Sequence, residues 1–196
     1  SPDAAGHDKL VSMIEEVQRL SHIVGQLAFL ARADAGQMAL NKEEVTLDEL
    51  VRDLADETAI LAAPRRIKVA LKACEPCRVN VDRMRLRQLL LNLADNAVKH
   101  NLEGGSVQIR LDTEGRHAVF SIRNTGPLLP PEQHERVFER FFRGDAAHGY
   151  ETEGSGLGLS VAQSIVAAHG GEIGYSTTGE ELTEVTFRLP LAGQER

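Results

Sequence analysis

Apolar residues recur every three or four positions along residues 8–33, and this spacing predicts one long amphipathic helix, with residues 1–6 as a loop before it. The stripe consists of Leu10, Ile14, Val17, Val24, Ala28 and Ala31, widened by Met13, Leu20, Ile23, Leu27 and Leu30. It is too broad for the seam of a two-stranded coiled coil and fits a helix of a bundle. We expect its partner to be a helix outside this sequence, a second copy, or the rest of the chain.

The remainder of the chain alternates between strand-like and helix-like runs. Strands are predicted at 45–47, 67–71, 78–81, 107–111, 118–123, 172–176 and 184–189. Helices are predicted at 48–63, from 82 to about 100 and at 157–169, with Asp48 and Asp82 as N-caps. Paired strands with interspersed helices indicate an α+β fold, a two-layer α/β sandwich. We therefore divide the chain into a bundle helix with its linker (1–40) and a sandwich domain (41–196).

Composition narrows the class of protein. The hydrophobic fraction of 42% and charged fraction of 26% are typical of a soluble globular domain. The formal net charge of -7 argues against nucleic acid as a partner. No apolar run reaches the roughly 18 residues of a membrane span, and no signal peptide opens the sequence. A piece cut from a longer membrane protein would give the same picture.

The two cysteines lie in the segment Cys74-Glu75-Pro76-Cys77. A redox pair or half of a zinc site would have this spacing. A zinc site needs two more ligands, and no close pair of His or Cys supplies them. We favour a turn between two strands that carries two incidental thiols.

The segment from Asn92 to His100 carries the most informative chemistry. Asn92 and Asn96 are four residues apart, so a helix places both amides on one face, and Lys99 joins that face. Two neutral oxygen donors beside a cation suit a magnesium ion that carries a polyphosphate. The amides could instead bond only neighbouring backbone, but two amides and a lysine together among leucines favour a binding site.

Three other segments add to this picture. Glycines in residues 154–159, between an irregular stretch and a predicted helix, would let backbone N–H groups approach phosphates, or form a plain loop. Asn124-Thr125-Gly126 ends a strand and could read the edge of a base, or form an Asx turn. Residues 137–143 hold three of the six phenylalanines, which we interpret as a plug that fills an apolar groove and anchors a mobile lid.

In this order and spacing, the four segments resemble the catalytic ATP-binding domain of sensor histidine kinases. That domain has the Bergerat ATPase fold, which type II topoisomerases, MutL and heat-shock chaperones share. Residues 92–100 are similar to its N box, 124–128 to its first glycine box, 138–143 to its F box and 154–159 to its second glycine box. Residues 8–54 resemble the second dimerisation helix and its linker.

The resemblance implies an ATP and Mg²⁺ site with catalytic roles for three residues. Asn96 would hold Mg²⁺ against the phosphates, and Asn92 would assist. Lys99 would contact phosphate, and Arg143 would approach the γ-phosphate during transfer. His100 stands beside the nucleotide, where the family usually has tyrosine.

The glycine boxes would bind the rest of the nucleotide. Asn124 matches the position that contacts the adenine amino group, where aspartate is usual, and its oxygen can still accept that hydrogen bond. Gly126 matches the first motif glycine, but Leu128 stands where a second is usual. The second glycine box would contribute Gly154, Ser155, Gly156, Leu157 and Gly158.

Asn92 also separates kinases from hydrolases within this group of proteins. The hydrolases carry a glutamate at this position that activates water, whereas an amide cannot take a proton at neutral pH. ATP would thus be preserved for another nucleophile, by resemblance a histidine in a His-Glu-x-x-Thr/Asn-Pro context. This sequence lacks that motif, so we expect that it binds Mg-ATP but cannot phosphorylate itself.

The resemblance predicts the kinase module of a two-component sensor, which passes its phosphoryl group through that histidine to an aspartate of a response regulator. The other expected partners are the phosphoacceptor-helix domain of the same protein and a second copy in the full-length parent. The parent would lie in the inner membrane, with this part in the cytoplasm. Two alternatives stay open: a nucleotide-binding pseudokinase or interaction module, favoured by Asn124 and Leu128, and an anti-sigma-type serine kinase of the same fold.

Overall fold

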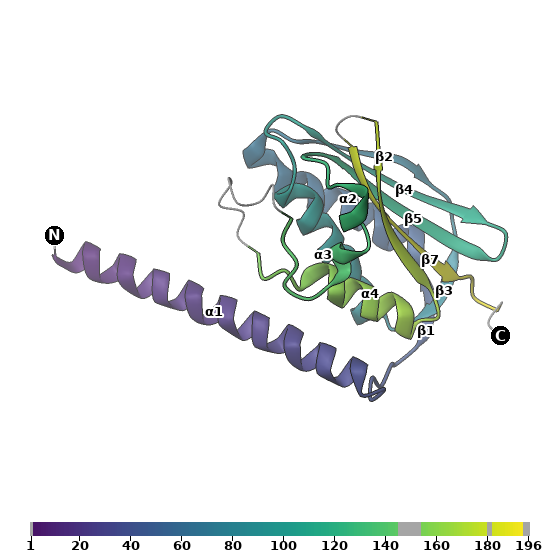
Figure 1. The fold of residues 1–196 in the computed structure, drawn as a ribbon, viewed down its shortest axis with the longest axis horizontal. Coiled ribbons are helices and arrows are strands. Elements are labelled where there is room, and N and C mark those ends of the chain that lie inside the picture. The colour runs from purple at the N-terminus through teal and green to yellow at the C-terminus, as the bar shows by residue number, and fades with distance from the viewer. Residues whose placement is uncertain (1, 145–153, 180–181, 194–196) are drawn as a thin grey trace.

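The protein is described from a computed structural model, which covers residues 2–144, 154–179 and 182–193, and the side chains from residue 9 onward. Helix α1 (Pro2–Asp34) projects from a compact α/β domain, as Figure 1 shows. It begins at Pro2, so the expected loop at residues 1–6 is wrong. Proline fits the first turn of a helix, and Ala4 and Ala5 are strong helix formers, so this start is locally favourable.

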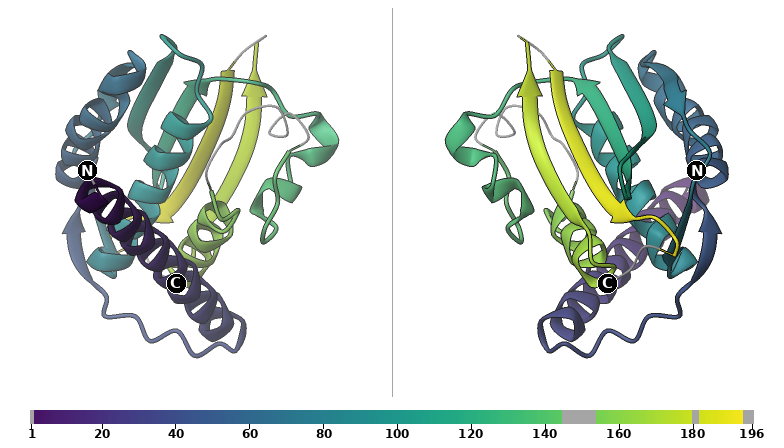
Figure 2. Two further views of the ribbon diagram at one scale, coloured as in Figure 1. Left: turned by 90° about the vertical axis from the view of Figure 1, so that its left-hand side faces the viewer. Right: turned by 90° about the vertical axis from the view of Figure 1, so that its right-hand side faces the viewer.

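The domain has two layers. Its five-stranded sheet has the order β2 (Lys68–Cys74), β4 (Ser106–Glu114), β5 (His117–Thr125), β7 (Leu182–Pro190), β6 (Glu172–Thr178). The β2–β4 pair is parallel and the other pairs are antiparallel. Helices α2 (Leu47–Ala62), α3 (Arg83–Lys99) and α4 (Gly158–Ala168) cover one face (Figure 2). The α+β two-layer prediction is confirmed.

Shorter elements connect these layers. Strands β1 (Glu43–Thr46) and β3 (Arg78–Val81) pair in a separate antiparallel ribbon. Three single-turn helices follow α2 and β5: η1 (Ala63–Arg65), η2 (Pro131–Gln133) and η3 (Arg136–Phe138). The segment between β5 and α4 has no longer element in its described part.

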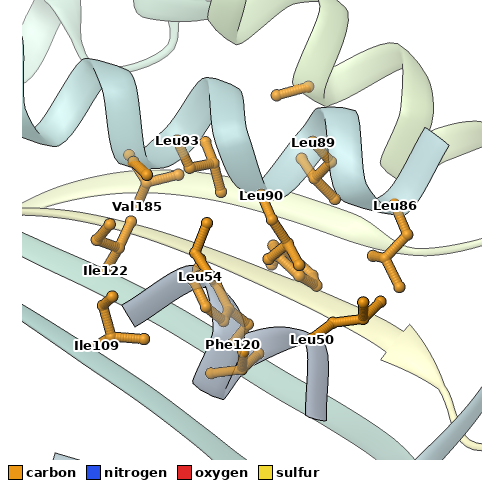
Figure 3. Packing of buried hydrophobic residues seen from close by; sticks show 14 of the residues in the cluster. Leu50, Leu54, Leu86, Leu89, Leu90, Leu93, Ile109, Phe120, Ile122 and Val185 are labelled. Carbon is orange, nitrogen blue, oxygen red and sulfur yellow. The ribbon is translucent and has the colours of Figure 1, made fainter. Parts of the chain in front are cut away.

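The hydrophobic core lies between the sheet and its helices (Figure 3). Helix α3 contributes a row of buried leucines at helical spacing: Leu86, Leu89, Leu90 and Leu93. The sheet contributes Ile109, Ile122 and Phe120, whose ring stacks on Phe187 at 4.9 Å between centroids. This burial fixes which face of α3 is turned inward, and therefore where its polar side chains lie.

The two predicted N-caps have different outcomes. Asp82 caps α3, because its Oδ1 accepts a hydrogen bond from the Arg85 amide at 3.0 Å. Asp48 does not cap α2, which begins one residue earlier and has Thr46 at the cap position. The Asp48 carboxylate is buried and accepts from Arg52 at 2.6 Å and from the Cys77 amide at 3.2 Å. It therefore joins α2 to the β2–β3 connection.

Most of the apolar stripe of α1 is exposed. Leu10, Met13, Val17 and Val24 are 60%, 65%, 61% and 63% exposed. Only the last turns pack on the domain, where Phe29 and Leu30 are buried and α1 contacts α4. The domain thus covers one end of the stripe and leaves the rest uncovered. No described helix is long and apolar enough to cross a membrane.

Candidate functional site

Asn92 and Asn96 lie on α3 at the side facing the start of α4. The Asn92 Nδ2 donates to the carbonyl oxygen of Gly158, the first residue of α4, at 3.3 Å. This bond uses the nitrogen of the amide and leaves its oxygen to accept from or coordinate a ligand. The predicted N box and second glycine box, 66 residues apart, therefore meet.

The Asn96 amide is half-buried and has no hydrogen-bond partner among the residues that the structure describes. Because this amide is partly exposed and no described group bonds to it, a ligand can reach it. Oxygen donors are what Mg²⁺ prefers. In the described chain, no cluster of three His, Cys, Asp or Glu side chains could hold a metal. The amide oxygens of the asparagines are donors of the type that fits a magnesium ion whose remaining ligands are phosphate and water oxygens.

The Lys99 ammonium group has a partner on its own helix. Its Nζ forms an ion pair with Asp95, one helical turn earlier, at 2.7 Å. Both side chains are about half exposed, so the pair contributes little to stability. A polyphosphate would compete with Asp95 for the ammonium group.

His100 ends α3 as its C-cap. Its side chain reaches the surface, yet the pKa of the imidazole is lowered. The main cause is lost hydration, and the nearby cations of Lys99, Arg143 and Arg65 add to it, while Asp95 opposes it. Arg143, the predicted γ-phosphate contact, thus lies in the same electrostatic environment as the end of α3. This concentration of positive charge suits a polyanion.

Asn124 is buried at the end of β5, and its amide orientation is fixed. Its Oδ1 accepts from the Thr183 hydroxyl at 2.8 Å, and its Nδ2 donates to the Thr125 carbonyl oxygen at 3.1 Å. Thr183 is itself buried and comes from β7. Thr183 was not predicted from the sequence, because only the β5–β7 register brings residues 124 and 183 together.

Gly126 is required by a close approach between two site segments. A Cβ at this position would lie 2.3 Å from the carbonyl oxygen of His100. No side chain fits that space, so the first glycine box packs directly on the end of the N box. Leu128, where the family usually has a second glycine, is half-buried.

The second glycine box turns into α4 without an acidic or capping side chain at the helix start. Gly156 has φ +67°, and a Cβ there would lie 2.8 Å from the Phe141 Cα. The Phe141 amide donates to the Gly156 carbonyl oxygen at 2.9 Å. The F box and second glycine box are therefore in contact, and the open start of α4 offers backbone N–H groups to an anion. Gly154, Ser155 and Leu157 precede that helix start, and Leu157 is fully buried.

The phenylalanine segment only partly fits its interpretation as a plug. Phe138 is buried beside α4, whereas Phe141 is 58% exposed with φ 62°. The Phe142 ring lies under the Arg136 guanidinium, 5.1 Å from its centroid. An open depression of about 280 Å³ lies within this segment and includes Arg143. The mobile lid that this segment is expected to anchor includes residues 145–153, which lie outside the described residues.

Helix α1 also reaches the second glycine box. Ser155 donates to the Oε1 of buried Gln26 at 3.1 Å, and Arg140 of the F box pairs with Asp34 at the end of α1. Both contacts join residues more than 100 positions apart, so no local sequence pattern predicts them.

Cys74 and Cys77 lie at the β2–β3 connection and form no disulfide in the structure. The Cys74 thiol lies 3.5 Å from the Asp48 carbonyl oxygen. Burial raises the pKa of both thiols, that of Cys77 to about 11. Neither is activated, and neither belongs to the nucleotide site.

Comparisons with known proteins show the family of this chain. Residues 81–193 match the family model of the histidine kinase-, DNA gyrase B- and HSP90-like ATPases. The sensor histidine kinase CusS of Escherichia coli O157:H7 is 33% identical over 95% of this chain and 38% of its own length. The chain spans about two-fifths of the length of the curated relatives it matches.

Two solved structures extend the comparison. Full-length ShkA in complex with AMPPNP has a TM-score of 0.76 and 32% identity over 89% of this chain and 36% of ShkA. The histidine kinase ThkA in complex with the response regulator TrrA has a TM-score of 0.73 and 27% identity over 93% of this chain and 50% of ThkA. The chain therefore belongs to the histidine kinase-, DNA gyrase B- and HSP90-like ATPase family, and it contains the catalytic domain of a sensor histidine kinase.

Proposed function

We propose that this chain binds Mg-ATP between α3, the end of β5 and the start of α4, and transfers the γ-phosphoryl group to a histidine that this sequence does not contain. The observation that carries the proposal is the half-buried Asn96 amide, which has no partner among the described residues, opposite the uncapped start of α4. The ShkA relative in complex with AMPPNP supports a nucleotide at this site.

The site residues would have two kinds of role, in binding Mg-ATP and in transferring its γ-phosphoryl group. Asn96 and the oxygen of Asn92 would hold Mg²⁺, which when bound neutralises phosphate charge. Lys99 and Arg143 would add positive charge around the transferred group. The backbone N–H groups of Gly156 and Gly158 would bind the remaining phosphate oxygens, whereas that of Leu157 donates to the Ser155 hydroxyl at 3.3 Å.

Asn92 would also protect ATP from water. Its nitrogen already donates to Gly158, and its oxygen is an amide oxygen that cannot act as a base near neutral pH. Water attack on the γ-phosphate would therefore proceed without assistance, and a positioned histidine nitrogen would compete successfully. The adenine base would be held by Asn124, whose orientation Thr183 fixes.

The exposed stripe of α1 would pair with further bundle helices. Leu10, Met13, Val17, Leu20 and Val24 are between 49% and 65% exposed along one stripe. A phosphoacceptor helix and a second copy of the full-length protein would together cover it, in a four-helix bundle. A response regulator would then accept the phosphoryl group, a role that the complex of ThkA with the response regulator TrrA supports. The whole protein would be a membrane sensor with this part in the cytoplasm.

A second candidate is a nucleotide-binding interaction module without transfer. Two departures favour it: a neutral amide at Asn124 and the half-buried Leu128 in place of a glycine. An anti-sigma-type serine kinase is disfavoured, because α1 and the F box contact each other through Asp34 and Arg140.

Two experiments separate these functions. Calorimetric titration with Mg-ATP tests binding, and a helix fragment with the expected histidine motif, supplied in trans, tests transfer of γ-³²P label. The kinase proposal expects saturable binding, label on the added histidine and none on this chain alone. Binding without label on the added fragment would favour the interaction module, and absence of binding would contradict both.

A further inference from the structure

The end of α3 is held without a glycine cap. The last four carbonyl groups of a helix lack partners within the helix and must find them elsewhere. His100, the C-cap, has φ -91° and ψ 13°, so no left-handed residue turns the chain back. The carbonyl oxygens of residues 97–99 receive hydrogen bonds from two side chains, those of Arg65 and Asn101, and that of Val98 also accepts from the Asn101 amide at 3.3 Å.

Arg65 reaches this end from η1, more than 30 residues earlier in the chain. Its Nη1 donates to the carbonyl oxygens of Val98 and Lys99, the latter at 3.0 Å, and its Nη2 donates to that of Asn101 at 2.7 Å. One planar guanidinium thus fixes three backbone carbonyl groups around His100. A cation at this place also interacts favourably with the helix dipole.

Asn101 continues the connection into the sheet. It is 5% exposed, and its Nδ2 donates to the carbonyl oxygens of Ala97 at 3.2 Å and Ser106 at 3.0 Å. Its Oδ1 accepts from the Thr125 hydroxyl at 2.6 Å, and that hydroxyl accepts from the Ser106 amide at 2.8 Å. We call the joined side chains of Arg65, Asn101 and Thr125 the node. A Cβ at Gly105 would lie 2.2 Å from the Asn101 Oδ1, so the backbone packs closely around this node.

The node lies between two parts of the proposed nucleotide site. On one side, Arg65 holds the backbone of Lys99. On the other, Thr125 stands between Asn124 and Gly126, and Gly126 lies against the His100 carbonyl. A partly buried hydrogen-bond network of this kind favours one arrangement of the segments that it joins.

We propose that Arg65 and Asn101 are positioning residues for nucleotide binding, which set the distance between the phosphate-contacting end of α3 and the base-contacting end of β5. This inference rests on the proposed function. Neither side chain needs to touch ATP, because both act through the backbone of residues 98–101 and through Thr125. A displacement of about 1 Å between binding segments is sufficient for a large loss of function.

The test compares Arg65→Met and Arg65→Lys with a control, Arg66→Met. Arg66 is the next residue, carries the same charge and is exposed, and its side chain has no hydrogen bond or ion pair within the described residues. Mg-ATP affinity is measured by calorimetry well below each variant's melting temperature, with hydrogen exchange of the amides of residues 99–101 and 124–126. Thr125→Val, which keeps the shape but removes the hydroxyl, tests the second half of the node.

Arg65→Met and Thr125→Val should each weaken Mg-ATP binding about ten-fold or more while the protein stays folded, and should raise amide exchange in both segments. Arg65→Lys should recover only part of the affinity, because an ammonium cannot reproduce the planar fork. Arg66→Met should bind as the parent does. If Arg65→Met and Thr125→Val lower only the melting temperature and leave affinity unchanged, or if Arg65→Lys restores it fully, the inference is wrong. A parent that fails to bind Mg-ATP would instead contradict the proposed function.

Discussion

The backbone of Gly126 lies so close to His100 that a Cβ would come within 2.3 Å of the His100 carbonyl oxygen. Gly126→Ala must therefore separate the first glycine box from the end of α3. We expect about 1–3 kcal/mol of lost stability from overpacking, and weaker Mg-ATP binding by about ten-fold. Gly174→Ala is the matched control, because an added Cβ in β6 meets no atom within 4 Å. Chemical denaturation and calorimetry of both variants check this, and equal effects would contradict it.

Asp95 should act against nucleotide binding. It forms a 2.7 Å ion pair with Lys99, which a polyphosphate must replace. Asp95→Asn frees the ammonium group and removes one negative charge near the site. We expect the dissociation constant of Mg-ATP to fall by a few-fold, because an exposed ion pair contributes only about 0–1 kcal/mol of interaction free energy. The gain should shrink at high salt, and unchanged or weaker binding at low salt would oppose this role for Lys99.

We expect the free energy of unfolding to depend on pH because of His169. It is buried at the end of α4, where its Nε2 accepts from the Asp82 amide at 2.9 Å and its Nδ1 lies 2.7 Å from the Ile165 carbonyl oxygen. Burial lowers the pKa of this imidazole from 6.5, because the charged form loses hydration. Above pH 6.5 its contribution to stability is fully present. As the pH falls below that value, the unfolded state binds a proton that the folded state does not, and stability is lost.

The variant His169→Gln isolates this effect. It should cost about 1–2 kcal/mol at pH 8, through the lost pair of hydrogen bonds. Between pH 6.5 and the lowered pKa of the folded state, its stability should fall less steeply than that of the parent. His100, whose pKa is also lowered, supplies a slope that both proteins keep. Parallel stability curves for parent and variant would show that His169 is not the group responsible.

Cys74 and Cys77 should react slowly with alkylating reagents at neutral pH. Burial raises the pKa of both thiols, and the thiolate is the reactive form. Cys74 is half-buried and Cys77 is buried, so Cys74 should be alkylated first. Mass spectrometry of a timed iodoacetamide reaction measures both rates. Rapid modification of Cys77 in the folded protein would contradict this environment.

Local patterns in the sequence predicted the elements and the segments of the site. The leucine spacing and the Asp82 cap of α3 are local features. The predicted cap at Asp48 was wrong because its side chain bonds Cys77, a partner 29 residues away. Thr183 and Arg65 were not predicted for the same reason: each reaches its partner only through the tertiary fold. The sequence therefore predicted which segments come together, but not the contacts that orient them.

The central claim is that Asn96 holds a magnesium ion against the triphosphate of ATP. Asn96→Ala removes an amide that has no partner among the described residues, so the fold should keep its stability. Calorimetric titration of the parent and of Asn96→Ala with ATP, with and without magnesium, measures the claim directly. We predict that the parent binds Mg-ATP and that the variant loses the magnesium-dependent part of the affinity. Equal affinity of both proteins in the presence of magnesium would contradict the account.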